Sequence, residues 1–194
     1  MRKIIILALS LISMGSLGAQ AADLNYSVSG SSVAHMEADL NLDGSAGFLS
    51  KLAGKSNFGK LTVVSTGDLD LWDQSSFCNI NPDTGFPESV NVTFFASNHV
   101  LRMDKGDLLY LSLSNSPPST LCFNFIDNVS STFEVYLYAI GGTGRFNNAS
   151  GTVFCQGESL AVGPGHNALS YACDGTLELE NGHRGKSKKS AKKR

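Results

Sequence analysis

The 194-residue sequence predicts an all-β fold, a single antiparallel β-barrel of about eight strands. Three observations support this prediction. Short apolar runs recur along the chain, clusters of Gly, Pro, Asn and Asp separate them, and no long stretch has the periodicity of a helix. Eight strands are about the number that closes a small barrel, and closure leaves no exposed sheet edge.

Alternation of apolar and polar residues places the individual strands. We expect strands at residues 60–72, 89–96, 99–103, 107–114, 121–126, 132–140, 150–156 and 168–180. Turn-forming segments such as NPDTGFP, DKGD, NSPPS and DNVSS separate them. The Gly-rich residues 44–59 are expected to form a short helical turn or a flexible loop.

The segment HMEADLNLDG (35–44) also alternates and ends in an Asp-Gly turn. Its letters contain D-x-N-x-D-G, which opens a calcium-binding loop. Such a loop needs an acidic residue at its twelfth position, where this chain has Ser50. The two-residue period and the missing acid both favour a strand, so we expect no metal site here.

The first residues have the pattern of a secretory signal peptide. Arg2 and Lys3 precede the apolar run IIILALSLI, and small residues follow up to Ala19-Gln20-Ala21. A membrane helix is the alternative, but the run is shorter than the roughly 20 residues needed to span a bilayer. We expect residues 1–21 to be removed between Ala21 and Ala22, and the protein to be secreted or periplasmic.

Charge divides the remaining chain into a domain at residues 22–183 and a basic tail at 184–194. The tail, RGKSKKSAKKR, holds seven of the 15 Lys and Arg residues, and the domain holds six basic against all 17 acidic residues. A segment with so few apolar side chains to bury is expected to be disordered. It either attaches the protein to an anionic surface or serves as a solubilising end. The acidic domain makes nucleic acid an improbable partner.

Four cysteines in an exported chain indicate two disulfides. Cys155 and Cys173 are equally far from Pro164 in VGPGHN, a predicted hairpin tip. Antiparallel pairing about that tip sets the two residues opposite each other. By elimination, Cys78 is then expected to join Cys122. No close C-x-x-C pair is present for zinc.

No compact catalytic motif is evident, and the four histidines are scattered. Asp68 and Asp70 share a strand face and could edge a pocket, or they could belong to an acidic surface. Glu134, Tyr136 and Tyr138 share a face of TFEVYLYAI. That face would orient a small aromatic or hydroxylated ligand if it lined the barrel interior. If it faces solvent, it is ordinary strand patterning.

The segment GGTGRF (141–146) is glycine-rich but lacks the Lys-Ser/Thr pair of a phosphate loop and the last glycine of a dinucleotide fingerprint. No cofactor is therefore expected. Between two strands, its glycines instead permit positive φ angles and close approach of the chain. We interpret the segment as a glycine turn joining two barrel strands.

GGTGRFNNASGTV (141–153) resembles a segment of the allene oxide cyclase and dirigent-like β-barrel superfamily. GKSNFGKLT (54–62) and GDLLYLSLS (106–114) are similar to an early strand entry and a middle strand of secreted bacterial relatives. The resemblance implies an eight-stranded antiparallel barrel whose interior can hold an apolar ligand. It also implies a cyclase or a dirigent-like activity as one possible function, and it supports fold more than reaction.

These observations lead to three hypotheses for function. The first is an exported, disulfide-stabilised barrel that binds a small apolar or aromatic molecule without chemistry. The second is a cyclase, isomerase or dirigent-like barrel enzyme. The third is a surface interaction protein attached electrostatically by its basic tail. A cavity that contains a carboxylate and an aromatic residue would favour the second.

Overall fold

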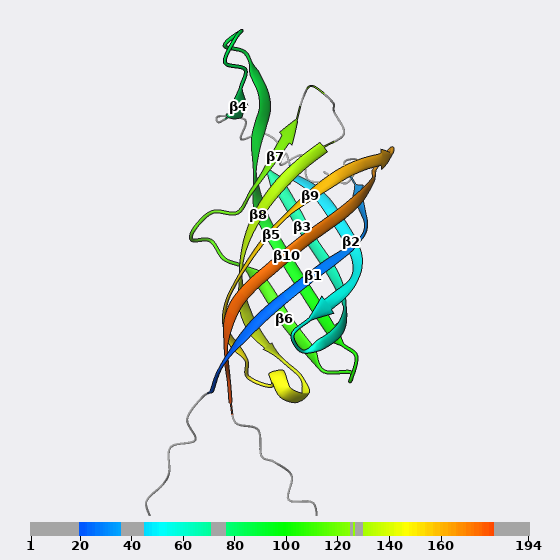
Figure 1. Cartoon of the computed structure of the whole chain (residues 1–194), viewed down its shortest axis with the longest axis vertical. Helices are drawn as coiled ribbons and strands as arrows, with labels where there is room; N and C mark the ends of the chain where they lie inside the picture. Colours follow the sequence, from blue (N-terminus) through cyan, green and yellow to red (C-terminus); the bar gives the residue numbers. More distant parts are fainter. Residues whose placement is uncertain (1–19, 36–44, 71–76, 125, 127–129, 181–194) are drawn as a thin grey trace, which may run out of the picture.

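The structure, a computed structural model, describes residues 20–35, 45–70, 77–124, 126 and 130–180. Figure 1 shows that these residues form strands almost throughout. The elements are β1 (Gln20–His35), β2 (Ser45–Ser56), β3 (Gly59–Asp70), β4 (Phe77–Ile80), β5 (Pro87–Met103), β6 (Leu108–Leu113), β7 (Thr120–Asn124), β8 (Ser130–Gly142), the 3-10 turn η2 (Gly144–Phe146), β9 (Ser150–Gly163) and β10 (His166–Leu179).

Eight of these strands close into an antiparallel barrel. Their order around the barrel is β1, β2, β3, β5, β6, β8, β9 and β10, and β10 pairs again with β1. The pairing of β3 with β5 over residues 61–70 and 93–103 completes the ring. The predicted fold class, an all-β antiparallel barrel of about eight strands, is therefore confirmed.

The two shorter strands extend this ring at one end. β7 follows β6 in the same position between β5 and β8, because β6 pairs with residues 98–102 of β5 and β7 with residues 89–93. β4 pairs with the start of β5, and the β4–β5 hairpin projects beyond the barrel in Figure 1.

Strand alternation accounts for most elements, but several predictions need correction. Residues 89–96 and 99–103, predicted as two strands, form the single strand β5. Residues 44–59, predicted as a loop or helical turn, instead contain β2 and a tight turn into β3. β2 pairs with β1 on one side and β3 on the other along its length. This pairing overrides the low strand propensity of its glycines and serines. β1 was not predicted either, although Leu24, Tyr26 and Val28 alternate inward along it.

Several predicted segments lie wholly or mainly outside the described residues: the signal peptide, the alternating segment 36–44 and the basic tail 184–194. Ala21 and Ala22, the predicted cleavage site, are described and pair with Glu178 and Leu177 at the start of β1. Cleavage there would leave nearly all of the β1–β10 pairing in place, and it stays a prediction. Within the described part of the chain, no helix is long and apolar enough to cross a membrane.

Both predicted disulfides are present. Cys155 of β9 lies directly opposite Cys173 of β10, with the Cα atoms 4.1 Å apart, and both residues are buried in the barrel. The second bond joins Cys78 of β4 to Cys122 of β7, with a Cα separation of 6.0 Å. It attaches the projecting β4 segment to the wall of the barrel.

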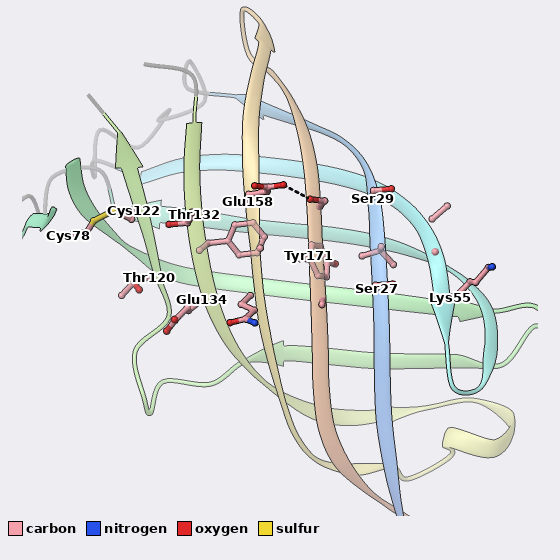
Figure 2. A pocket seen from close by; sticks show the side chains of 18 of the residues that line it. Ser27, Ser29, Lys55, Cys78, Thr120, Cys122, Thr132, Glu134, Glu158 and Tyr171 are labelled. Atoms are coloured by element: carbon pink, nitrogen blue, oxygen red, sulfur yellow. Dashed lines mark hydrogen bonds between the residues drawn. A yellow bond between two sulfur atoms is a disulfide. The ribbon is translucent and has the colours of Figure 1, made fainter. Parts of the chain in front are cut away.

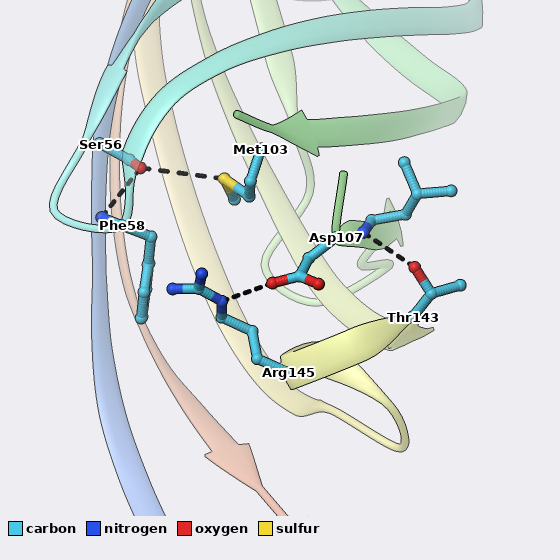
Figure 3. A network of polar contacts seen from close by, with 7 residues as sticks. Ser56, Phe58, Met103, Asp107, Thr143 and Arg145 are labelled. Carbon is cyan, nitrogen blue, oxygen red and sulfur yellow. Dashed lines mark hydrogen bonds and ion pairs between the residues drawn. The ribbon is translucent and has the colours of Figure 1, made fainter. Parts of the chain in front are cut away.

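The GGTGRF segment closes one end of the barrel, which we call the plugged end. The plugged end also contains the β2–β3 turn, the β5–β6 turn and η2. Phe146 of η2 is fully buried there and packs edge-on against Phe58, with 5.4 Å between ring centroids. Arg145 lies over both rings, and its Nε donates to Asp107 Oδ2 at 2.7 Å (Figure 3).

Two glycines permit this arrangement. Gly144 has φ +61°, and a side chain there would run into the Asp107 carboxylate. A side chain at Gly142 would meet the Leu108 carbonyl and Phe146. The segment joins β8 to β9, as the glycine-turn interpretation predicted. It is also a structural plug, which the sequence did not predict.

We expect Phe146→Ala to lower the free energy of unfolding by about 3–5 kcal/mol, because it empties the plug and leaves a cavity in a fully buried site. The control is Phe86→Ala at the β4–β5 hairpin, where the side chain is 74% exposed and a change within about 0.5 kcal/mol is expected. Urea denaturation of both variants measures the difference. Equal losses in the two would contradict the plug.

Candidate functional site

The barrel interior divides into a filled half and a half that contains a cavity. Large apolar side chains such as Leu24, Leu101, Leu109 and Leu177 fill the half next to the plugged end. Towards the other end, which we call the cavity end, the interior holds a cavity of about 100 Å³. Its apolar walls come from six strands and consist of Phe48, Leu69, Phe94, Leu121, Phe133, Val135, Leu169 and Tyr171.

A continuous row of polar residues crosses this cavity. Five residues, each directly opposite the next on neighbouring strands, form the row, which we call the polar row. In order around the barrel these are Asn167, Ser32, Ser50, Ser65 and His99. All five line the cavity, and the last four are buried. The alternation of each strand points one residue inward at this level, and here that residue is polar.

His99 is the centre of a hydrogen-bonded cluster at one end of the row. Its Nδ1 lies 3.1 Å from Ser65 Oγ and 3.3 Å from Tyr171 Oη, and its Nε2 lies 2.9 Å from Ser97 Oγ. The Tyr171 ring also meets the imidazole edge-on. Three strands, β3, β5 and β10, therefore hold the imidazole in one orientation.

Burial keeps this cluster neutral. Desolvation lowers the pKa of His99 to about 4, so the imidazole is uncharged at neutral pH. Burial likewise raises the pKa of Tyr171 to about 12, although a hydrogen bond with Ser65 acts in the opposite direction. No Asp, Glu, Lys or Arg is among the described residues that line the cavity. His99 and Tyr171 are the titratable groups of that lining.

Ser50 occupies the middle of the polar row. Its side chain is 1% exposed, and its Oγ has no hydrogen-bond partner among the described residues. A buried hydroxyl without a partner costs free energy, typically about 1–3 kcal/mol. Ser50 therefore leaves an unused hydrogen-bonding group in the wall of the cavity.

A second, much shallower depression lies on the outside of the barrel. This outer groove has a volume of about 1120 Å³ and runs across the outer faces from β2 to β7 (Figure 2). Small polar side chains such as Ser27, Ser29, Thr120 and Thr132 line most of it. Glu158 accepts a hydrogen bond from Ser170 there, at 3.3 Å.

The three residues proposed on β8 have their side chains on the outer face of the barrel. Glu134 is exposed and contributes to the outer groove, and Tyr138 is also exposed. Tyr136 packs against Phe154 with 4.8 Å between ring centroids. Of the two orientations that the sequence left open for this face of β8, the structure has the outward one.

The two aspartates lie elsewhere. Asp68 is exposed near the end of β3, and Asp70 is the last residue of that strand. Because β3 and β8 are not neighbours, the structure does not bring these aspartates together with Glu134, Tyr136 and Tyr138. The role of all five as pocket residues stays a prediction.

The sequence did not single out the cavity residues. One signal was available in SNHVLRM, where Ser97, His99, Leu101 and Met103 alternate along one face of β5 and are all buried. A histidine in phase with two buried apolar residues is expected to point inward. Nothing in the sequence alone shows that Ser65 of β3 and Tyr171 of β10 meet it.

Comparisons with known proteins assign this chain to no family. No protein-family model matches the sequence, and no curated protein does. Among solved structures the chain is similar to a pterocarpan synthase dirigent protein, with 12% sequence identity and a TM-score of 0.42 over 89% of this chain and 97% of that one. The assignment of a closed eight-stranded barrel rests on the strand pairings, and the allene oxide cyclase part of the resemblance stays a prediction.

We expect His99 to make the protein less stable as the pH falls. The unfolded chain binds a proton near the ordinary histidine pKa of about 6.5, whereas the folded chain binds it only near 4. Stability is therefore lost progressively between about pH 6.5 and pH 4, by about 3 kcal/mol from this group.

His99→Gln should remove that component, and Tyr171→Phe, which keeps the imidazole, should retain it. Urea denaturation at several pH values measures the slope for each variant. If His99→Gln has the slope of the wild type, burial of a neutral His99 is refuted.

Proposed function

We propose that this protein is a disulfide-stabilised β-barrel that binds a small apolar or aromatic molecule in its interior cavity and acts outside the cytoplasm. The observation that carries the proposal is the cavity itself, which has apolar and aromatic walls and an unused hydroxyl at Ser50. Ligand sites are concave, mostly apolar and equipped with a few polar groups that orient the ligand.

The volume of the cavity limits the size of the ligand. A closed apolar cavity of about 150 Å³ can hold benzene. The present cavity is smaller, but half-buried residues such as Phe48, Leu69 and Leu169 are part of its wall, so it is not sealed at the cavity end. A single small ring fits these dimensions, with room for a substituent towards the surface.

Binding is favoured over catalysis by the chemistry of the lining. A carboxylate beside an aromatic residue would have favoured the enzyme hypothesis, but the described lining has aromatic residues and no carboxylate. A barrel enzyme would have to rely on His99 and Tyr171. The pKa values of about 4 and about 12 lie far from neutral, which makes both groups weak proton-transfer catalysts at neutral pH.

We expect Leu169→Trp to abolish binding of toluene, because a larger side chain in the cavity wall fills the space. Leu160→Trp on the adjacent strand is the matched control, since Leu160 is 49% exposed and does not line the cavity. Amide chemical-shift changes in the labelled protein report binding, and thermal melting reports folding. Unchanged binding in a folded Leu169→Trp variant would argue against the interior site.

Native mass spectrometry of protein purified from its own host tests the same proposal independently. A reproducible added mass that disappears in Leu169→Trp and persists in Leu160→Trp would identify the ligand. An added mass that persists in both variants would place the ligand elsewhere.

Electrostatic attachment through the basic tail is a second candidate. One observation favours it. The described chain ends beside its own start, because Gln20 pairs with Leu179, and both lie at the plugged end (Figure 1). Lys60 near the start of β3, Lys105 and Arg145 lie at that end. Asp107 pairs with Arg145, and Asp104 adds a second negative charge there. The seven charges of residues 184–194 would therefore supply the attraction, with the cavity end pointing away.

We expect the full chain to bind vesicles that contain phosphatidylglycerol and not vesicles of phosphatidylcholine alone, because each basic residue near an anionic membrane contributes about 1 kcal/mol. Truncation before Arg184 should abolish sedimentation with the vesicles, and so should 1 M salt, where screening acts within about 3 Å. Sedimentation of the truncated protein equal to that of the full chain would refute the anchor.

A further inference from the structure

The polar groups of the cavity indicate which kind of small molecule it takes. This inference rests on the proposed function and concerns the same site. It starts from a count of hydrogen-bond donors and acceptors in the wall. In a low-dielectric interior each unpaired donor or acceptor is costly, so the count determines what a ligand must supply.

The imidazole of His99 cannot accept a hydrogen bond from all three hydroxyls around it. Three hydroxyls, those of Ser65, Ser97 and Tyr171, lie within 3.3 Å of the ring nitrogens. A neutral imidazole has one lone pair, so it accepts from one of them whichever tautomer is present. A second proton can pass from Ser65 to Tyr171. At least one hydroxyl proton therefore has no acceptor within the cluster.

Ser50 adds another donor close by. It lies directly opposite Ser32 on one side and Ser65 on the other, yet its Oγ has no partner among the described residues. The backbone of β2 around Ser50 is paired with β1 and β3 on both sides, which engages its carbonyls in the sheet. The hydroxyl proton of Ser50 is thus available to a molecule in the cavity.

The absence of charged groups from the described lining restricts the class of ligand further. The described lining has no Lys or Arg, and the imidazole is neutral at neutral pH, so an anionic ligand would leave a buried charge uncompensated. A carbonyl oxygen accepts two hydrogen bonds and brings none.

We propose that the cavity selects neutral, compact carbonyl compounds, whose oxygen accepts a hydrogen bond from Ser50 while the apolar body packs against the phenylalanine walls. The body corresponds to a single ring of five or six atoms. The oxygen is held deep in the barrel, at the level of the polar row, and the remainder points towards the cavity end.

Cyclohexanone and methylenecyclohexane test this proposal, because the two molecules have nearly the same shape and differ in whether oxygen or carbon is double-bonded to the ring. Ser50→Ala should weaken binding of cyclohexanone about fivefold, as expected for one lost hydrogen bond, and leave binding of methylenecyclohexane unchanged or tighter.

Ser89→Ala is the matched control. Ser89 is also a buried serine whose Oγ has no partner among the described residues, but it does not line the cavity. This substitution should leave the affinities for both probes unchanged. Chemical-shift titration of the labelled protein gives the dissociation constants, and thermal melting verifies that both variants are folded.

The outcomes distinguish a failure of this inference from a failure of the proposed function. If Ser50→Ala changes the two affinities equally, or leaves that for cyclohexanone unchanged, carbonyl selection is wrong and apolar binding in the cavity stands. If neither probe binds the wild type at millimolar concentration, the proposed interior site fails and this inference fails with it.

Discussion

The pairing of β3 with β5 is the constraint on which the rest of the structure depends, because it converts a curved sheet into a closed ring. Once eight strands are closed, the width of the interior is set, and it is just large enough for side chains or for one small ligand. Whether a cavity exists then depends only on which side chains point inward. Leucines fill the interior near the plugged end, and serines leave space near the cavity end. No lid or separate domain is needed to form the site.

The buried serines of the polar row make the barrel less stable than apolar residues at the same positions would. Burial of a hydroxyl or an imidazole is unfavourable unless it is hydrogen-bonded, and an apolar replacement of similar shape is often neutral or stabilising. The barrel offsets most of this cost, because neighbouring strands place Ser65 opposite His99 and Tyr171 supplies a further contact. Ser50 is the member of the row whose Oγ has no such compensation among the described residues. The stability of the barrel therefore does not explain these polar atoms, whereas the proposed binding of a ligand in the cavity does.

The same serines explain why the sequence predicted some strands and not others. Residues 132–140 were predicted as a strand because Val135, Leu137 and Ala139 point inward and produce a clear alternation. The Cys155–Cys173 bond was predictable because two residues equally spaced about a hairpin tip must pair. In β1 and β2 the inward positions near the cavity are Ser32 and Ser50, so the alternation of hydrophobicity disappears where the cavity begins. In β1 and β2, residues that line the candidate site are thus among those that conceal the strand pattern.

The glycine-rich segment GGTGRF is conspicuous in the sequence, but it does not form the candidate site. Gly142 and Gly144 are needed because side chains there would collide with Phe146 and Asp107. Phe146 belongs to the plug, and Asp107 forms an ion pair with its Arg145. The plug closes the end of the barrel that is away from the cavity, and none of its residues lines the cavity. A resemblance carried by this segment therefore concerns how the barrel is closed and not what it binds. A shared fold does not by itself determine function, so a shared plug leaves the ligand of the other half open.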